Sequence, residues 1–218
     1  MTLGLTASLD AGLAALALDL SSEQRGRLLD FINLLQKWNR TYNLTAIREP
    51  EAMLSHHVLD SLAVLPLLKK SALARRRTEP WRLTDVGSGA GLPGIVLAIA
   101  QPDWLIRSID TVDKKAAFQR QVVIELGLPN VEVVSGRVEK LPPASTDAVI
   151  SRAFAELVDF VALAGHLIVP GGSLFAMKGV LPEHEITRLP PDWRATLVVP
   201  IEVPGLDVQR HMIVLEKM

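Results

Sequence analysis

The 218-residue chain contains no cysteine, which excludes disulfide bonds and metal sites built from thiolates. It also lacks a basic excess, since its formal net charge is −1. A protein that binds bare nucleic acid by itself usually carries a clear positive charge. Any contact with RNA would therefore depend on local positive charge, or on partners that help to present the RNA.

Long apolar runs are absent as well. None reaches the roughly 18 residues that a membrane-spanning helix needs. The first 20 residues are apolar, but they have no basic start and they include Asp10 and Asp19, which argues against a secretory signal. Hydrophobic residues make up 49% of the chain, enough for a sizeable core. We expect a soluble cytoplasmic protein with no membrane contact.

Glycines gather in the stretch from Leu83 to Gly94, which reads LTDVGSGAGLPG. The stretch starts as an apolar strand, turns through repeated glycines, and leads into the helical run from Ile95 to Ala100. A strand, a glycine turn and a helix together hold a nucleotide at the helix N-terminus. Glycine suits such a turn because it has no Cβ to block a ligand and it tolerates positive φ.

Two cofactor classes fit this turn. The run from Gly89 to Gly94 matches G-x-G-x-x-G, the pattern of NAD(P)-dependent oxidoreductases. That interpretation needs the strand to continue to Ser88, which would leave Asp85 inside it as a costly unpaired carboxylate. If the turn instead starts at Gly87, the pattern Asp-x-Gly-x-Gly-x-Gly resembles the first motif of S-adenosylmethionine-dependent methyltransferases. The motif favours the second class, and a tight turn without a ligand is the third possibility.

The chain divides near residue 80. Apolar residues recur at helical spacing over 8–20, 22–39 and 51–68, and Ser21 or Ser22 can cap the second helix. We interpret residues 1–80 as a helical extension packed on a core of residues 81–218. In that core we expect strands at 82–86, 104–110, 131–134, 147–151, 173–177, 195–202 and 210–217.

Helices are expected between these strands, after Pro93, at 113–127 with a glycine C-cap, and at 157–168, where Pro170-Gly171-Gly172 then turns the chain. Alternating strands and helices predict a Rossmann-like, mostly parallel sheet covered on both faces. The last two strands have no long helix between them, so we expect an antiparallel hairpin at one edge.

Ligands bind such sheets beyond the carboxyl ends of the strands, where polar residues gather in this sequence. Asp110 ends the second strand at the usual position of a ribose-binding acid, although it could also cap the next helix. Arg152 could form a structural ion pair, or it could bind a cofactor carboxylate or a substrate phosphate. Lys178 presents the same alternatives. Val138 and Glu139 follow the third strand, where an adenine would lie.

Two histidines, His56 and His57, lie on the third expected helix on the same side as Asp60. Such a pair could perform acid–base chemistry, or it could be a hydrogen-bonded pair that locks the extension to the core. The run Arg75-Arg76-Arg77 could be a solvated loop or a phosphate contact.

Short stretches along nearly the whole chain together resemble the bacterial small-subunit (16S) ribosomal RNA guanine-N7 methyltransferase G family, also called glucose-inhibited division protein B. In the order of that family they are Trp38 to Thr45, His57 to Ser61, Asp85 to Gly94, Ser151 to Phe154, Met177 to Gly179, and Arg210-His211. The family usually has a basic residue where His56 stands.

This resemblance implies an enzyme that transfers a methyl group from S-adenosylmethionine to N7 of one guanine in 16S rRNA, or in a small-subunit assembly particle. We expect the enzyme to be a monomer. A small-molecule methyltransferase on the same fold is the alternative. The resemblance assigns cofactor contacts to Gly87, Leu92, Val138, Glu139 and Arg152. The strand-end pattern adds the remaining cofactor candidates, which are Asp85, Gly89 and Asp110.

Methylation at N7 needs no general base, because this nitrogen carries a lone pair and no proton. Positioning can supply much of the rate. We therefore assign no catalytic base and no metal site. The candidates for positioning the guanine are Arg152, Phe154, Lys178 and Arg210, of which the aromatic ring is suited to stacking.

Overall fold

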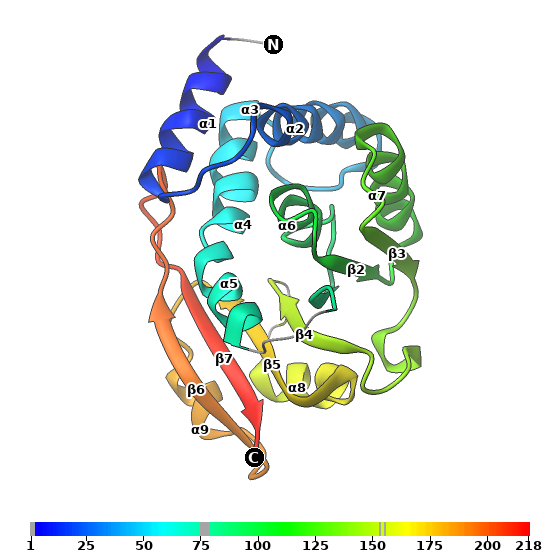
Figure 1. Ribbon diagram of the computed structural model, residues 1–218, viewed down its shortest axis with the longest axis vertical. Coiled ribbons are helices and arrows are strands. Elements are labelled where there is room, and N and C mark those ends of the chain that lie inside the picture. The colour runs from blue at the N-terminus through cyan, green and yellow to red at the C-terminus, as the bar shows by residue number, and fades with distance from the viewer. Residues whose placement is uncertain (1–2, 75–78, 153, 155) are drawn as a thin grey trace.

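Figure 1 shows the computed structural model, which describes residues 3–74, 79–152, 154 and 156–218. Its centre is one seven-stranded sheet of order β3-β2-β1-β4-β5-β7-β6. The strands are β1 (Arg82–Val86), β2 (Leu105–Asp110), β3 (Val131–Ser135), β4 (Thr146–Ser151), β5 (Ile168–Lys178), β6 (Trp193–Pro200) and β7 (His211–Lys217). The first five strands are parallel, and β7 runs antiparallel to β5 and β6. The predicted mostly parallel sheet with an antiparallel edge hairpin is confirmed.

Helices fill the chain before the sheet. They are α1 (Leu3–Ala15), α2 (Ser22–Tyr42), α3 (Pro50–Met53), the π-helix η1 (Leu54–Leu59), α4 (Asp60–Leu62) and α5 (Leu65–Ala74). The predicted helix over 8–20 is wrong at its end, because Ala17 takes a φ of 52° and stops the helix although the leucine spacing continues. The predicted helix over 51–68 is interrupted by η1. No helix within the described ranges is long and apolar enough to cross a membrane.

The later helices are α6 (Gly94–Ala100), α7 (Asp113–Leu126), α8 (Leu157–Ala164) and α9 (Glu183–Thr187), with short 3-10 turns η2 (Val138–Lys140) and η3 (Gly165–Leu167). The predicted glycine C-cap of α7 is Gly127, which is left-handed. The predicted helix end at Ile168 and the turn at 170–172 are wrong, because β5 already begins at Ile168. The proline and glycines are absorbed as a bulge, since Thr146 pairs with Ile168 whereas Ala148 pairs with Ser173.

Each face of the sheet carries its own apolar layer, because successive strand residues point to opposite faces. On β5, Phe175 joins the layer that contains helices α1 to α7, whereas Leu174 and Ala176 join the layer under α8. The helices before β1 therefore share one apolar core with α6, α7 and the sheet. Figure 1 shows α1, α2 and α3 at the top of the molecule and α8 near its bottom.

A polar clamp joins α2 to α6. Ser21 caps α2, accepting a hydrogen bond from the Gln24 N–H at 3.2 Å, while Gln24 Oε1 accepts from the Ser21 N–H at 2.9 Å. The Nε2 of Gln24 donates to the carbonyls of Ile99 and Ala100 at 3.0 and 3.1 Å. One glutamine thus completes the start of α2 and satisfies carbonyls at the end of α6.

The capping box makes a prediction about stability. Ser21→Ala removes the oxygen that satisfies an N–H at the start of α2, so we expect a loss of about 1 kcal/mol in the free energy of unfolding. Urea denaturation followed by circular dichroism measures it. Ser22→Ala is the matched control, since this exposed neighbour lies inside the helix and has no capping role. Equal losses in the two variants would show that the cap does not matter.

Candidate cofactor and substrate site

The strand order reverses between β1 and β4, so the crevice beyond their carboxyl ends is the place for a ligand. At the end of β1, Asp85 is fully buried. Its Oδ2 accepts a hydrogen bond from the Gly94 N–H at 2.8 Å, and its Oδ1 has no hydrogen-bond partner among the described residues. Burial raises the pKa of Asp85 from 3.8 to about 7, although the Gly94 bond and the charge of Arg152 lower it. This carboxyl group therefore has an unused oxygen and gains from a nearby cation.

The turn after β1 begins at Gly87, whose φ is 71°, and β1 itself ends at Val86. The strand thus stops before Ser88, whereas the dinucleotide interpretation needs it to continue to that residue. Glycine is also required at the close of the turn, since a Cβ on Gly94 would lie 2.8 Å from Asp85 Oδ2. The helix expected after Pro93 is α6, which begins at Gly94 with Pro93 as its N-cap.

Asp110 fixes the middle of the turn. Its Oδ2 accepts from the Gly89 N–H and its Oδ1 from the Val112 N–H, each at 2.8 Å. From α7, the buried Gln119 donates to Ser88 Oγ and to the Gly89 carbonyl, also at 2.8 Å each. The expectation that Asp110 caps the next helix is wrong, because the N-cap of α7 is Val112 and no side chain among the described residues caps it. The role of Asp110 as a ribose-binding acid stays a prediction, which the geometry allows because a carboxylate oxygen can accept more than one hydrogen bond. Gln119 carried no sequence signal that distinguished it from other helical residues.

One cavity, of about 290 Å³, lies beside this turn and is lined by half of the predicted cofactor residues, namely Gly87, Asp110, Val138 and Glu139. Phe154 lines it as well. Phe154, which we expected near the substrate, is therefore on this side, with its ring 5.0 Å from that of Phe160. Leu92 does not line the cavity; its side chain is buried in the apolar core.

A second cavity of similar volume, about 290 Å³, lies where the N-terminal helices meet the sheet. The helical part supplies Ile47, His56, His57 and Asp60, and the sheet part supplies Arg152, Met177, Lys178, Gly179 and Arg210. Three of the four residues that we expected to position a substrate thus line this cavity. It contains more cationic than anionic side chains.

Asp60 is the central carboxylate of the second cavity, and it is 1% exposed. Its Oδ2 lies 3.0 Å from Arg152 Nη1 and its Oδ1 lies 2.8 Å from Arg210 Nε. The expected hydrogen-bonded pair of Asp60 with a histidine is therefore wrong. Asp60 accepts hydrogen bonds from the two arginines instead. Arg152 Nη1 also donates to the His56 carbonyl at 3.0 Å. Both expectations for Arg152 remain, because it forms an ion pair and also faces a cavity.

His57 is buried and neutral at ordinary pH. Burial, followed by the charge of Arg152, lowers its pKa from 6.5 to about 4. Its Nε2 lies 2.9 Å from Thr45 Oγ1, which also accepts the Ile47 N–H at 3.2 Å. The side chain of Asn39 accepts from the Thr45 N–H at 2.9 Å and donates to the Ile47 carbonyl at 3.0 Å. These bonds fasten the loop after α2 against the cavity.

Lys178 connects the two cavities. Its Nζ lies 2.7 Å from Glu185 Oε2 and donates to the Phe154 carbonyl at 3.3 Å. Glu185 also accepts the N–H of Leu157, the first residue of α8, at 2.8 Å. Glu185 has no sequence signal, since it lies on a short helix after the last parallel strand and belongs to no recognisable motif.

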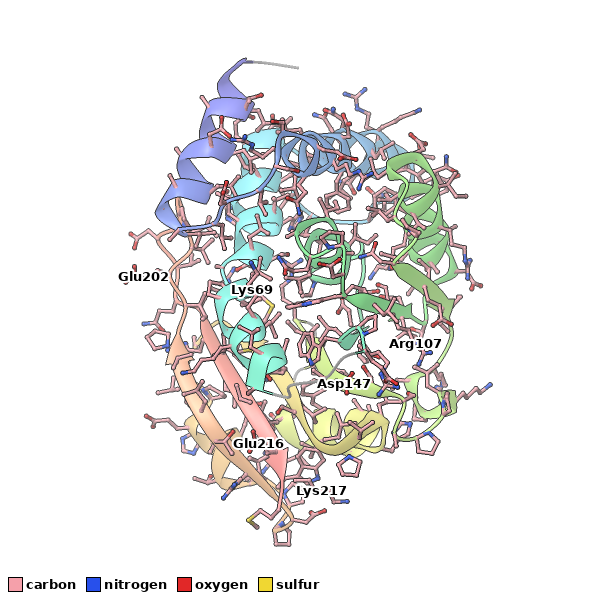
Figure 2. All side chains as sticks on the ribbon, in the orientation of Figure 1. Lys69, Arg107, Asp147, Glu202, Glu216 and Lys217 are labelled. Atoms are coloured by element: carbon pink, nitrogen blue, oxygen red, sulfur yellow. The ribbon has the colours of Figure 1, made fainter. Side chains whose placement is uncertain are left out.

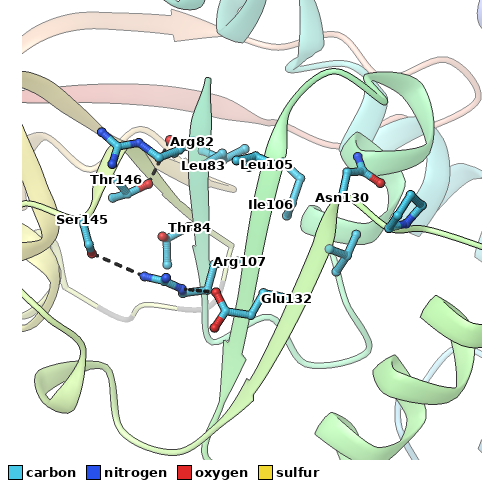
Figure 3. A pocket seen from close by; sticks show the side chains of 12 residues that line it. Arg82, Leu83, Thr84, Leu105, Ile106, Arg107, Asn130, Glu132, Ser145 and Thr146 are labelled. Atoms are coloured by element: carbon cyan, nitrogen blue, oxygen red, sulfur yellow. Dashed lines mark hydrogen bonds and ion pairs between the residues drawn. The ribbon is translucent and has the colours of Figure 1, made fainter. Parts of the chain in front are cut away.

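A further cavity of about 220 Å³ lies at the opposite edge of the sheet, at the amino ends of β1 and β2 (Figure 3). Arg107 forms an ion pair there with Glu132 at 2.7 Å and contacts Ser145 Oγ at 3.4 Å. None of the predicted site residues lines this cavity. The arginine run at 75–77 lies outside the described residues.

Comparison with known proteins identifies the family. The family described as rRNA small subunit methyltransferase G matches residues 24–213. The chain belongs to this family. It is 54% identical over 216 residues to "Ribosomal RNA small subunit methyltransferase G" of Aromatoleum aromaticum, covering 97% of this chain and 98% of that one. It is 52% identical to the protein of the same name from Azoarcus sp., covering 94% and 93%.

Solved structures agree on the fold. A SAM-dependent methyltransferase from Aquifex aeolicus gives a TM-score of 0.57 at 19% identity, covering 75% of this chain and 92% of that chain. A 16S rRNA adenine methyltransferase from Catenulisporales acidiphilia gives a TM-score of 0.54, also at 19% identity, covering 69% and 90%. The Rossmann-like methyltransferase fold that the sequence predicted is therefore confirmed.

The two shifted pKa values predict how stability depends on pH. Between pH 4 and 7, folded Asp85 keeps a proton that the unfolded chain releases, so its contribution to stability falls as pH rises, at roughly 1.4 kcal/mol per unit. We expect Asp85→Asn to gain stability relative to the unmodified protein across this window and to run parallel to it above about pH 7. Urea denaturation at several pH values measures the difference.

His57 provides the control of opposite sign. Between pH 4 and 6.5 the unfolded chain binds a proton at this residue that the folded chain does not, so stability rises with pH. His57→Asn should therefore lose stability relative to the unmodified protein as pH rises through that window. Equal slopes for the two variants would contradict the burial of these groups in the folded state.

Proposed function

We propose that this protein transfers a methyl group from S-adenosylmethionine to N7 of one guanine in 16S rRNA. It acts in the cytoplasm as a monomer, on the RNA itself or on a small-subunit assembly particle. The main support is membership of the rRNA small subunit methyltransferase G family over nearly the whole chain. The net charge of −1 favours a particle, whose proteins can help to present the RNA.

The first cavity fits the cofactor. Asp85 supports binding of its amino-acid end, because the orphan Oδ1 can accept hydrogen bonds from an ammonium group. Asp110 lines the cavity with acceptor capacity left for ribose hydroxyls. Val138, Glu139 and Phe154 would surround the adenine, with the phenyl ring available for stacking. When bound, the cofactor supplies an electrophilic sulfonium methyl group.

The second cavity fits the substrate. Lys178, Arg152 and Arg210 carry the positive charge that an RNA strand needs. Arg152 lies close enough to influence the pKa of Asp85 and also lines the second cavity. It therefore belongs to both halves of the site, which suits a reaction that brings a methyl donor and a base together.

No residue has to remove a proton, because N7 of guanine carries none. The geometry agrees with a reaction that depends on positioning. His57, the best candidate for a base, is occupied on Nε2 by Thr45 and on Nδ1 by the His56 carbonyl. Holding the two reactants in line can supply up to about 7–11 kcal/mol of the barrier.

Mass spectrometry of 16S rRNA tests the activity. RNA from cells that lack this gene should lose one N7-methylguanosine, and the purified protein with S-adenosylmethionine should restore it on isolated small subunits or assembly particles. A variant with Asp85→Asn should restore it more slowly, because the cofactor contact is weakened. An unchanged methylation profile in the gene-deleted cells would overturn the proposed substrate.

Cofactor binding should also release a proton. Near pH 6 the Asp85 carboxyl group is mostly protonated, and a cation beside it favours the ionised form. Titration calorimetry of S-adenosylmethionine in buffers of different ionisation enthalpy should give a release of up to about one proton per molecule bound. The release should vanish in Asp85→Asn and fade above pH 8. Heats independent of the buffer would argue against a role of Asp85 in cofactor binding.

A further inference from the structure

Asp60 joins parts of the chain that are far apart in sequence. Arg152, which follows β4, is 92 residues away, and Arg210, which precedes β7, is 150 residues away. Each guanidinium takes one of the two carboxylate oxygens, at 3.0 and 2.8 Å. The carboxylate is 1% exposed, whereas both arginine side chains are 27% exposed. Asp60 thus lies beneath the two arginines, on the side away from solvent.

The π-helix η1 builds this arrangement. The Asp60 N–H donates to the Ser55 carbonyl, five residues back, as well as to that of His57. Such segments are rare and frequently occur at functional sites. In the segment that results, the His56 carbonyl also reaches Arg152 Nη1, at 3.0 Å. Three oxygens of the N-terminal helices, one from His56 and two from Asp60, therefore hold the two guanidiniums.

The guanidiniums keep donors for a ligand. Within the described residues, Nε and Nη2 of Arg152 and Nη2 of Arg210 make no hydrogen bond. Two arginines and one carboxylate leave one net positive charge, and Lys178 lines the same cavity of about 290 Å³. Planar guanidinium forks that are already held in place match the oxygens of a phosphate.

We propose that Asp60 is a positioning residue that sets Arg152 and Arg210 side by side, forming a subsite for a backbone phosphate of the RNA next to the target guanine. This proposal rests on the proposed function. It assigns the helical extension a direct part in recognising the substrate. The ligand is one phosphodiester group, bound by the donors that Asp60 leaves unused.

The direction in which one substitution changes kcat/KM tests this proposal. Asp60→Asn removes a negative charge beside the RNA, so simple electrostatics predicts that the variant binds RNA more tightly. Positioning predicts the opposite, because the amide of asparagine offers donors to at least one guanidinium and leaves it unheld. We expect kcat/KM for the small-subunit particle to fall about 100-fold, mainly through a higher KM. Unchanged or improved kcat/KM would overturn the proposal.

Asp147→Asn is the matched control. Asp147, labelled in Figure 2, is also a buried carboxylate, and its Oδ2 lies 3.2 Å from Arg82 Nε. It pairs with the first residue of β1, at the edge of the sheet opposite the site. A loss of stability alone should affect both variants, whereas the rise in KM should occur only with Asp60→Asn. A similar rise in both, measured at equal folded fraction, would mean that Asp60 has a structural role only.

Arg210→Gln keeps the proposal testable if Asp60→Asn does not fold, because it leaves the ion pair between Asp60 and Arg152 intact. We expect it to raise KM for the particle while the dissociation constant for S-adenosylhomocysteine stays unchanged, since Arg210 does not line the first cavity. Adding Arg210→Gln to Asp60→Asn should raise KM by less than the two separate effects combined, because Asp60 acts in part through Arg210. A normal KM in Arg210→Gln would contradict the subsite.

The phosphate subsite can be tested even if the proposed function is wrong. If the unmodified protein transfers no methyl group to the particle, equilibrium binding of 16S rRNA fragments replaces turnover as the readout. Binding weakened by Asp60→Asn and by Arg210→Gln, but not by Asp147→Asn, would still support the phosphate subsite. Equal binding by all the variants would overturn it.

Discussion

The buried carboxylate of Asp85 is the constraint on which the arrangement of the site depends. Its bond to the Gly94 N–H joins the end of β1 to the start of α6, across the whole glycine turn. Only glycine fits at position 94, because the carboxylate occupies the space that a side chain would need. The same burial leaves the other oxygen without a hydrogen-bond partner in the part of the chain that the structure describes, and it raises the pKa of the group to about 7. The fold therefore keeps a buried polar group whose burial costs free energy. A positively charged ligand bound beside it can offset that cost.

The rest of the site is arranged on either side of this point. One cavity follows the ends of β1, β2 and β3 and is moderately polar, whereas the other is cationic and lies under the N-terminal helices. Arg152 follows β4, and Lys178 is the last residue of β5. These two residues lie between the two cavities, at the ends of neighbouring strands. Because adjacent parallel strands end at the same edge, two short segments are enough to place a donor site beside an acceptor site.

Much of this could be predicted from the sequence. Strand β1 and the C-cap at Gly127 follow from local patterns, and the glycine turn, Asp110 and Val138 follow from where strands end. The rest could not be predicted because it depends on contacts between distant residues. No periodicity distinguishes η1 from an α-helix, and nothing near Asp60 indicates that its partners are Arg152 and Arg210 rather than His56. Phe154, expected to stack on the guanine, lines the cavity beside the glycine turn, and its contact with the guanine stays a prediction.

The position of β7 has a consequence for how the protein acquires its structure. This strand lies between β5 and β6, although it follows both in sequence. Consequently β6 has no place in the sheet until β7 has been added, and Arg210, next to β7, reaches Asp60 only then. The edge of the sheet and the cationic cavity should therefore form together, late in folding and through pairings between distant segments, which are slow to form. A partly folded chain would have its glycine turn in place but would lack the complete cationic cavity that we propose binds RNA.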